Sequence, residues 1–579
     1  MQNTSSRNRT YWLAVMTVAI MGVFVLRLFY LQVIRHDYYS TLASAEQMKQ
    51  WVLPAERGEI YAMNGDEPVK LVLNETIYTV WADPKVVEEP GKVISTLKRV
   101  AGGNVLDDFE KLLDKKDTRY QVLAKGISSQ QAQMIKKEKI YGIGFERGDR
   151  RVYPEGQLAA QTLGFVNSEG EGRYGVEAGL NDRLTGKDGL LNTVVDVRDV
   201  PLTIGKDNVS ISAKNGEDLV LTIDRNIQAY AEKALAKGIE KTGAKQASAL
   251  IMDPRSGKVL AMANIPTYDP SKLDNVRDVA AFNNNTVSNP YEPGSDIKAF
   301  TVAIGIDRGV ITPQSTYNNT DYIKVDDRTI SNAVKGETGI IDMQHALNLS
   351  LNTGMVTIAQ RLGNGSYITK EARNVMYEYL HNRLGLGELT GIEVANEASG
   401  TVISPDGVQG NAVRYSNMAF GQGMDVTMIQ VTSAFSALVN GGSYYHPTVV
   451  AGTMNEDEFV AAPERDPSRS VIKPSTSSDV SEMVHQARNY MFSDADSPGY
   501  YIGGKTGTSQ TLRDGKYVNN ETIGTYLGFG GEKDQPTSYV IMIEVSGEGM
   551  NLEGGKHALP IFTDISNWML QYLKLQPKG

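Results

Sequence analysis

The strongest pattern of hydrophobic positions lies close to the N-terminus. From Tyr11 to Ile34 the only charged residue is Arg27. As a helix with a rise of 1.5 Å per residue, this stretch would be about 36 Å long, enough to cross a hydrocarbon core of about 30 Å. A cleaved signal peptide is the main alternative, but the stretch is long and no small-x-small cleavage pattern follows it. We therefore expect residues 11–34 to be a retained membrane anchor.

The orientation of this anchor is suggested by the lengths of chain on its two sides. Arginines flank the stretch on both sides, so the positive-inside rule does not decide. Residues 1–10 form a short tail, and no segment after the anchor is comparably apolar. We expect a single-pass membrane protein with a cytoplasmic tail at residues 1–10 and a large body outside the membrane.

After the anchor, the pattern of predicted strands and helices changes near Gly216. Residues 37–51 have the pattern of a polar helix, which Pro54 would end. From about 55 to 215, glycines separate short β-branched runs such as residues 77–81, and a helical pattern covers residues 128–138. We interpret residues 35–215 as a mixed, elongated module.

Longer and more regular elements follow from residue 216. Residues 219–223 alternate as a strand, Asp224 is suited to cap the helix after it, and Gly243 is suited to end that helix. Further strands are predicted at 247–252, 258–263, 501–510, 523–529 and 538–545, and a last helix at 564–575 capped by Asp564. Strands at both ends with helices between them predict one α+β domain whose sheet draws on both ends.

The amino-acid composition excludes several kinds of functional site. The chain is 41% hydrophobic and 22% charged, as in ordinary globular proteins, and its net charge of −10 argues against a general nucleic-acid surface. Cysteine is absent, which excludes disulfides, thiolate nucleophiles and cysteine metal sites, and six scattered histidines do not suggest a metal centre. We therefore expect no metal centre, and nothing in the composition calls for a cofactor.

A Pro-Gly turn followed by Ser295 and an apolar helix contains one lysine, Lys298. The i, i+3 spacing puts the amine over the hydroxyl, and both burial and a helix N-terminus would lower the pKa of the lysine. Such a lysine can act as the base that activates a serine nucleophile. The structural alternative is a serine helix cap with a lysine that reaches out to solvent.

Spacing alone does not identify this pair, because other matches occur. Ser95 and Lys98 lie in a polar helical stretch, and Ser470 and Lys473 run directly into Pro474, which prevents a common helix. Only Ser295 has the turn before it and the apolar helix after it.

Two later stretches of the chain offer groups that could act together with Ser295 and Lys298. Ser350 and Asn352 lie where a helical pattern is interrupted, although a capping turn is the commoner meaning of such a triplet. Residues 505–508, Lys-Thr-Gly-Thr, begin a strand whose two hydroxyls share one face and whose glycine lets a peptide backbone come close. A second Lys-Thr-Gly, at residues 241–243, is predicted to be a glycine-capped helix end.

The ordered set of these three motifs resembles the S-x-x-K, S-x-N and K-T-G motifs of the penicillin-recognising serine transpeptidases. With the single anchor and the module before the catalytic motifs, it resembles the class B penicillin-binding proteins, and residues 419–423 look closer to the division-specific, FtsI-like branch than to the elongation branch. Other stretches that match the family are 27–33, 57–60, 64–65, 151–154, 163–166, 172–177, 291–295 and 421–423.

The resemblance implies both a fold and a reaction. The fold is α+β: a transmembrane helix, an elongated pedestal at 35–215, and a penicillin-binding/β-lactamase-like transpeptidase domain at 216–579 with an antiparallel sheet flanked by helices. The reaction is the cross-linking of peptidoglycan stem peptides ending in D-Ala-D-Ala, in bacterial cell-wall synthesis at the cytoplasmic membrane. β-Lactams would be inhibitors, and a polytopic glycosyltransferase with division or elongation proteins would be partners.

The resemblance also implies a role for each motif residue. Ser295 would be the nucleophile and Lys298 its base, Ser350 and Lys505 would pass a proton to the leaving amine, and Asn352 would orient the substrate amide. The terminal carboxylate and the oxyanion would be bound by the strand, through the residues Thr506, Gly507 and Thr508 together with the amide of Ser295.

Two positions depart from the family pattern. Asp296 stands where a small or hydroxyl residue is usual, and within one turn of Lys298 it could favour the charged amine. Ala62 and Met63 stand where the family has Asp-Arg. These departures keep two alternatives open, a catalytically attenuated scaffold or sensor that binds wall precursors, and a D,D-carboxypeptidase.

Overall fold

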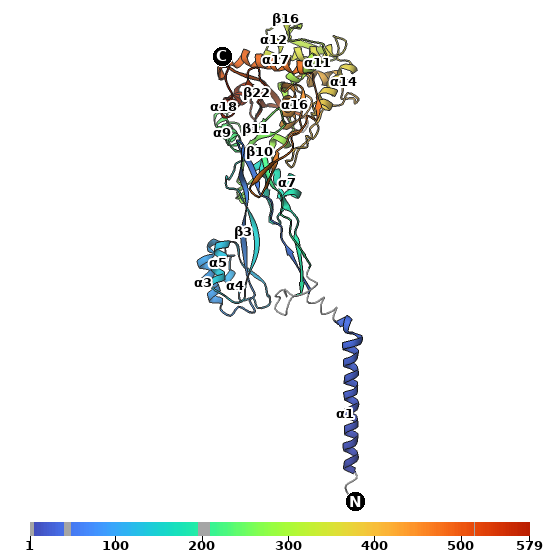
Figure 1. Cartoon of the computed structure of the whole chain (residues 1–579). Coiled ribbons are helices and arrows are strands. Elements are labelled where there is room, and N and C mark those ends of the chain that lie inside the picture. The colour runs from blue at the N-terminus through green and yellow to red at the C-terminus, as the bar shows by residue number, and fades with distance from the viewer. Residues whose placement is uncertain (1–4, 40–47, 195–208, 514–515, 579) are drawn as a thin grey trace. The chain divides into compact units, whose positions relative to one another are not determined.

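The structure is a computed structural model that describes residues 5–39, 48–194, 209–513 and 516–578 (Figure 1). It divides into two compact units. The first comprises Met1–Arg57 with Thr185–Gly216, and the second comprises Gly58–Leu184 with Glu217–Gly579. The predicted anchor lies in the first unit, and the predicted catalytic residues lie in the second.

The first unit contains the apolar helix and a small sheet. Helix α1 (Ser5–Phe29) continues into the π-helix η1 (Tyr30–Ile34), and no other helix in the described part of the chain is long and apolar enough to cross a membrane. Strands β1 (Met48–Leu53), β8 (Gly189–Val194) and β9 (Val209–Ile211) form an antiparallel sheet.

The polar helix expected at residues 37–51 is wrong at its C-terminal end. Residues 36–39 are helical and 40–47 lie outside the described residues, but from residue 48 the chain forms β1, paired in register with β8. The pairing partner lies far away in sequence, so the local helical pattern did not reveal it.

The lower part of the second unit is a seven-stranded sheet. Its order is β19-β18-β10-β2-β3-β4, with β5 paired to β3. The strands are β2 (Ile60–Asn64), β3 (Glu67–Ala82), β4 (Gln121–Ser128), β5 (Ile143–Val152), β10 (Asp218–Asp224), β18 (Val450–Asn455) and β19 (Glu458–Ala461). Because β10 lies between β2 and β18, this sheet is built from both sides of the expected boundary at residue 216.

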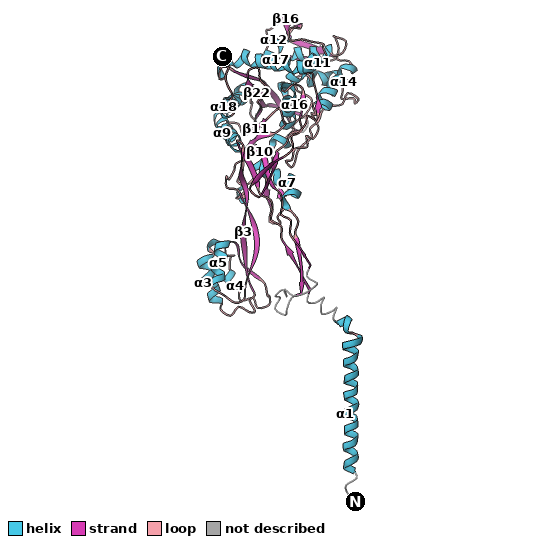
Figure 2. Cartoon of the chain, in the orientation of Figure 1, coloured by secondary structure: helices cyan, strands magenta, loops and turns pink. Residues whose placement is uncertain are grey.

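A small helical layer covers one end of β3 (Figure 2). It consists of α3 (Pro90–Val100), α4 (Phe109–Leu112) and α5 (Ser129–Lys137), which enclose their own core around Val80, Leu97 and Ile127. Ser128 caps α5, with its side chain accepting from the amide of Gln131. The helix predicted at 128–138 and the strand predicted at 77–81 are confirmed.

The upper part is built on a five-stranded antiparallel sheet in the order β12-β11-β23-β22-β21. The strands are β11 (Gln246–Met252), β12 (Val259–Ile265), β21 (Tyr500–Arg513), β22 (Lys516–Glu532) and β23 (Tyr539–Ser546). The prediction of a sheet that draws on both ends of the domain is confirmed. Strand β21 is at the end of this order, and its outer edge has no strand partner among the described residues.

Alternation along the strands divides the sheet into two buried faces. Residues such as Ala249 and Ile543 pack with α9 (Arg225–Thr242) and α18 (Leu559–Tyr572) on one face. Residues such as Leu250 and Met542 belong to a larger core on the other face, which includes α11 (Lys298–Asp307) and α16 (Met428–Val439). The catalytic motifs lie on this second face.

The predicted ends of α9 are confirmed and the predicted start of α18 is wrong. The carboxylate of Asp224 accepts from two amides at the start of α9, and Gly243 ends the helix at φ 72°. Helix α18, by contrast, begins at Leu559 with a proline in its first turn. Asp564 lies inside it and instead accepts from the hydroxyl of Tyr230 and pairs with Lys237.

The remaining elements complete both parts. The helices are η2 (Gly102–Asn104), α6 (Ala160–Leu163), α7 (Gly175–Gly179), α8 (Asn181–Thr185), η3 (Leu273–Asn275), η4 (Val279–Phe282), α10 (Asn285–Ser288), η5 (Gly294–Ile297), α12 (Met343–Asn348), α13 (Asn352–Arg361), α14 (Lys370–Tyr377), η6 (Glu378–Arg383), α15 (Ala412–Met418), α17 (Pro474–Phe492), η7 (Ser493–Ala495) and η8 (Gly554–Ala558). The short strands are β6 (Phe165–Val166), β7 (Gly172–Arg173), β13 (Thr316–Asn319), β14 (Tyr322–Val325), β15 (Arg328–Ser331), β16 (Gly339–Asp342), β17 (Ser443–Tyr444) and β20 (Arg469–Ser470).

Candidate active site

Ser295 lies in the 3₁₀ turn η5, immediately before α11. The amide of Lys298 donates to the carbonyl of Ser295, and a 3₁₀ turn places residues i and i+3 in line. Ser295 is partly exposed whereas Lys298 is buried. Neither η5 nor α11 has a side-chain cap, so the alternative reading of Ser295 as a helix cap is not supported.

A close approach of main chain fixes this turn. Gly294 has φ 59°, and its amide donates to the carbonyl of Gly421 at 2.9 Å. A Cβ at Gly294 would lie 2.9 Å from the carbonyl oxygen of Thr508, and one at Gly421 would collide with the carbonyl of Gly294. Glycine is therefore required at both positions, and the backbone of β21 lies directly beside the turn that carries Ser295.

The second motif brings two lysines to one hydroxyl. Ser350 lies between α12 and α13 with φ 57°, an uncommon conformation for a residue other than glycine. Lys298 Nζ is 2.6 Å from the carbonyl oxygen of Ser350 and 3.0 Å from its Oγ. Lys505 Nζ, from β21, is 2.9 Å from the same Oγ. The structure thus brings together a residue from each of the three motifs.

Burial lowers the pKa values of both lysines. Lys298 is 1% exposed and Lys505 is 4% exposed. Burial, and next the charge of Lys505, lower the pKa of Lys298 well below its ordinary value. Burial also lowers the pKa of Lys505, to about 8, but the charge of Asp296 opposes this shift. Lys298 is accordingly the amine that is more readily neutral, and so available to take a proton, and Lys505 is the one that keeps its proton at neutral pH.

The other predicted residues lie around this group. Asn352 begins α13 and is partly exposed, and its side-chain amide donates to the carbonyl of Ser331 at 2.9 Å. Thr506 is partly exposed, with its carbonyl oxygen 3.1 Å from Lys505 Nζ. Thr508 is exposed, and its hydroxyl accepts from the amide of Gly554 at 3.2 Å. Gly507, between the two threonines, is buried.

The chance matches lie elsewhere, as the sequence predicted. Lys98 is exposed on α3 and pairs with Glu110 at 2.5 Å. Lys473 donates to the carbonyl of Asp307, and it stands in extended conformation before α17. The second Lys-Thr-Gly, at residues 241–243, is the glycine-capped end of α9.

The side chain of Asp296 contacts β22, and its charge opposes the fall in the pKa of Lys505; that it also favours the charge of Lys298 stays a prediction. Its side chain is fully buried, and its Oδ2 accepts from the hydroxyl of Thr525 on β22 at 2.7 Å. Burial raises the pKa of Asp296 to about 7, with the hydrogen bond from Thr525 and the charge of Lys505 opposing this. Because Thr525 lies more than two hundred residues away, no local pattern could have revealed this contact.

Glu292, three residues before Ser295, also holds the turn. Its carboxylate accepts from the amide of Gly423 at 2.7 Å and from the hydroxyl of Tyr517 at 3.1 Å. The two stretches 291–295 and 421–423 thus meet in the structure. Only the resemblance of both stretches to the same family pointed to this contact.

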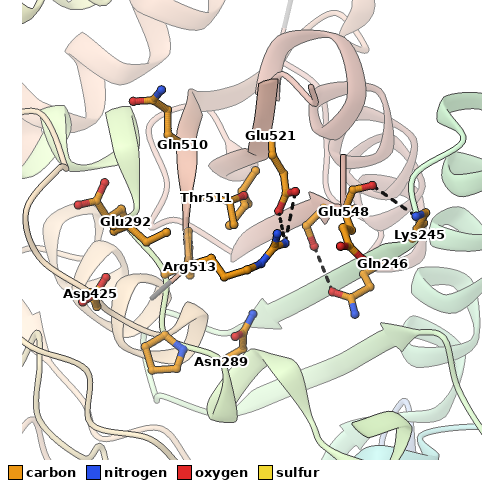
Figure 3. Close-up of a pocket in the computed structure, with 16 residues that line it drawn as sticks. Lys245, Gln246, Asn289, Glu292, Asp425, Gln510, Thr511, Arg513, Glu521 and Glu548 are labelled. Carbon is orange, nitrogen blue, oxygen red and sulfur yellow. Dashed lines mark hydrogen bonds and ion pairs between the residues drawn. The ribbon is translucent and has the colours of Figure 1, made fainter. Parts of the chain in front are cut away.

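Glu292 also lines a polar cavity of about 390 Å³ at the far end of β21 (Figure 3). In this view Gln510, Thr511 and Arg513 line it from β21, and Arg513 pairs with Glu521 at 3.0 Å. The catalytic candidates do not line this cavity. The residues of the three motifs therefore lie outside this cavity, in the partly exposed region around Ser295 and Thr508.

Comparison with known proteins decides the family. Residues 247–567 match the penicillin-binding protein transpeptidase domain, and residues 52–221 match the penicillin-binding protein dimerisation domain. The chain belongs to the penicillin-binding protein transpeptidase family. With both domains present, it is a class B penicillin-binding protein: a serine-type peptidoglycan D,D-transpeptidase of bacterial cell-wall synthesis.

Relatives of this penicillin-binding protein match over nearly its whole length. Stage V sporulation protein D of Bacillus subtilis is 28% identical, over 100% of this chain and 87% of the relative. Peptidoglycan D,D-transpeptidase FtsI of Escherichia coli is 26% identical, over 95% and 89%. The crystal structure of penicillin-binding protein 3 from Mycobacterium tuberculosis complexed with aztreonam superposes with a TM-score of 0.66, at 25% identity over 91% and 98%. With its apolar helix near the N-terminus, the chain is a single-pass membrane protein.

Proposed function

We propose that Ser295 is the nucleophile of this transpeptidase and that Lys298, Ser350 and Lys505 form the proton relay around it. The observation that carries the proposal is the hydroxyl of Ser350, which lies 3.0 Å from one lysine and 2.9 Å from the other. A hydroxyl accepts and donates at the same time, so it can pass a proton between the two amines.

In the first half-reaction, the neutral amine of Lys298 takes the proton from the hydroxyl of Ser295. The Ser295 oxygen then attacks the carbonyl carbon of the penultimate D-Ala of a stem peptide. The amides of Ser295 and Thr508 stabilise the oxyanion. The C–N bond to the terminal D-Ala breaks, and the departing amine receives a proton from Ser350, which Lys505 replaces. The products are a serine ester and free D-Ala.

In the second half-reaction, an amine of a neighbouring stem peptide attacks the ester carbonyl. The new amide bond forms and the ester C–O bond breaks. Ser295 Oγ takes back its proton from Lys298, and the proton that the attacking amine releases passes through Ser350 to Lys505, so the enzyme returns to its starting state. Asn352 orients the amide of the stem peptide. Thr506 and Thr508 bind the terminal carboxylate of that peptide before its last D-Ala leaves. Gly507 lets the substrate backbone approach β21 as an added strand.

In the proposed organisation this chemistry takes place on the outer, periplasmic side of the cytoplasmic membrane. Residues 1–10 are a cytoplasmic tail, 11–34 the anchor, 35–215 the pedestal and 216–579 the transpeptidase domain. The partners are a polytopic glycosyltransferase and proteins of the division complex. A septal role is supported by residues 419–423, which look like the division branch, and by the match to FtsI. A fluorescent fusion should concentrate at the septum, and depletion should produce filaments; rounding of the cells instead would favour the elongation branch.

Labelling with a fluorescent penicillin tests the nucleophile. Ser295→Ala should abolish covalent labelling of the full-length protein in detergent, because the ester cannot form. Ser95→Ala is a matched control, since Ser95 belongs to the exposed S-x-x-K match on α3 and should label as the wild type does. Labelling that survives Ser295→Ala at an unchanged rate would refute the assignment.

Mass spectrometry of products from defined stem peptides separates the alternatives. A transpeptidase should yield cross-linked dimers together with free D-Ala. Free D-Ala with no dimer would indicate a D,D-carboxypeptidase. Tight binding of stem peptide without either product would indicate a scaffold or sensor.

A further inference from the structure

The residue after the nucleophile is a fully buried carboxylic acid. One oxygen of Asp296, Oδ2, accepts from the hydroxyl of Thr525 at 2.7 Å. The other, Oδ1, is buried and has no hydrogen-bond partner among the described residues. A buried carboxyl group is costly unless it is neutral or faces a positive charge, so Asp296 requires an electrostatic explanation.

The strand beside Asp296 carries the positive charge. A Cβ at Gly507 would lie 2.9 Å from Asp296 Oδ2, so the carboxyl group packs directly against β21. Lys505 is two residues earlier on the same strand, and residues two apart on a strand project from the same face. The carboxyl group of Asp296 and the amine of Lys505 therefore share one buried face of β21.

The site holds two amines, those of Lys298 and Lys505, and one hydroxyl, that of Ser350. The relay requires that one amine is neutral and the other is charged. Lys298 and Lys505 are both buried, and their Nζ atoms lie at 3.0 Å and 2.9 Å from Ser350 Oγ. Two charged lysines in this space would repel each other, and two neutral ones would leave no acid for the leaving group. When the carboxylate of Asp296 is present, one charged lysine makes the buried cluster neutral overall. A neutral cluster costs less free energy to bury than a charged one.

We propose that Asp296 is a positioning residue for the proton of this site: its carboxylate keeps the proton on Lys505, so that Lys298 remains free to act as the base. This inference rests on the proposed relay through Ser350 and adds to it the group that sets its direction. It gives a role to the residue that departs from the family pattern, and it does so without contact between Asp296 and substrate.

The other ionisable groups around Asp296 do not supply the same charge. Burial, and next the charges of Asp296 and Glu544, raise the pKa of Tyr291 well above its ordinary value, so its hydroxyl is neutral. Burial raises the pKa of Tyr526 to about 12, and its hydroxyl accepts from Arg488, which is itself paired with Asp496. Glu544 faces Thr525 across the β22–β23 register.

The test is the pH dependence of acylation by a fluorescent penicillin, measured between pH 5.5 and 9.5 on the full-length protein in detergent. Asp296→Asn keeps the shape of the side chain and removes its charge. Lys505 should then lose its proton at lower pH, and the alkaline limb of the profile should move down by about 1 pH unit. The ratio of wild-type to variant rate should be close to one at pH 6, where Asp296 is protonated, and about tenfold higher above pH 8.

Two further variants test whether the shift of the alkaline limb comes from the charge of Asp296. Asp296→Thr removes the charge with a different side chain and should show the same shift, which covers the case in which Asp296→Asn does not fold. Glu544→Gln removes a second fully buried carboxyl group, which lies opposite Thr525 on β23 and is not part of the proposed relay, and should leave the alkaline limb in place.

The outcomes separate the two proposals. A rate ratio that is the same at every pH, or a faster acylation of either Asp296 variant above pH 7, would overturn the role of Asp296 and leave Ser295 as nucleophile. Absence of labelling in the wild type would overturn the proposed function and this inference together.

Discussion

Replacing Glu544 by glutamine should stabilise the protein above pH 7. Glu544 is fully buried on the catalytic face of the five-stranded sheet, and its Oε2 has no hydrogen-bond partner among the described residues. Burial raises its pKa from 4.5 to about 7. The folded protein therefore binds this proton more tightly than the unfolded chain does.

The sign and size of the effect follow from proton linkage. Where the folded state binds more protons, the free energy of unfolding falls as pH rises. The loss begins near the unfolded value, 4.5, and is complete once pH exceeds the folded value, about 7. A shift of this size corresponds to about 3 kcal/mol, as an upper limit, at about 1.4 kcal/mol for each pH unit. Glutamine cannot ionise, so the variant should not undergo this loss.

The assay is urea unfolding at several pH values from 4.5 to 9, followed by tryptophan fluorescence. Trp568 stacks on Tyr230 with ring centroids 4.3 Å apart, so its emission reports on the helices α18 and α9 beside the sheet. The difference in free energy of unfolding, Glu544→Gln minus wild type, should increase up to about pH 7 and then stay constant. Glu240→Gln, on the exposed side of α9, is the matched control. If the difference for Glu544→Gln is the same at pH 5 and pH 8, the reasoning is refuted.

Two other substitutions test the relay and the lower sheet. Ser350→Ala removes the hydroxyl between Lys298 and Lys505, so acylation by labelled penicillin at pH 7 should slow by about 10³-fold while the unfolding midpoint changes little; a loss below tenfold would contradict the relay. Arg151→Met removes the buried ion pair with Glu177 and should cost about 3–5 kcal/mol in urea unfolding, part of which a second change, Glu177→Leu, should restore.

The fold could be predicted where the deciding interaction is local. Asp224 accepts from amides two and three residues ahead, and Gly243 needs only its own left-handed conformation, so both ends of α9 could be recognised from sequence. The strand β1 could not, because its conformation depends on pairing with β8. The residue type of Asp564 suits a helix cap, but the partners that hold its carboxylate, Tyr230 and Lys237, lie on α9.

The same distinction applies to the candidate site. Ser295 and Lys298 are one turn apart, so their relation could be worked out from spacing. That Lys298 and Lys505 meet at Ser350 could be expected only from the resemblance of the ordered motifs to the family. The environment of Asp296 could not be predicted at all, because it depends on Thr525 and Gly507, on two strands that pack against η5.

The open edge of β21 has a consequence for inhibitors and resistance. A ligand that lies along this edge can pair with the N–H and C=O groups that alternate residues of β21 direct away from β22, and these groups are the same whatever side chains the strand carries. Substitutions that change a side chain remove a side-chain contact but leave these main-chain groups in place. An inhibitor that obtains most of its affinity from the edge of the strand would therefore leave the bacterium fewer single mutations by which to escape.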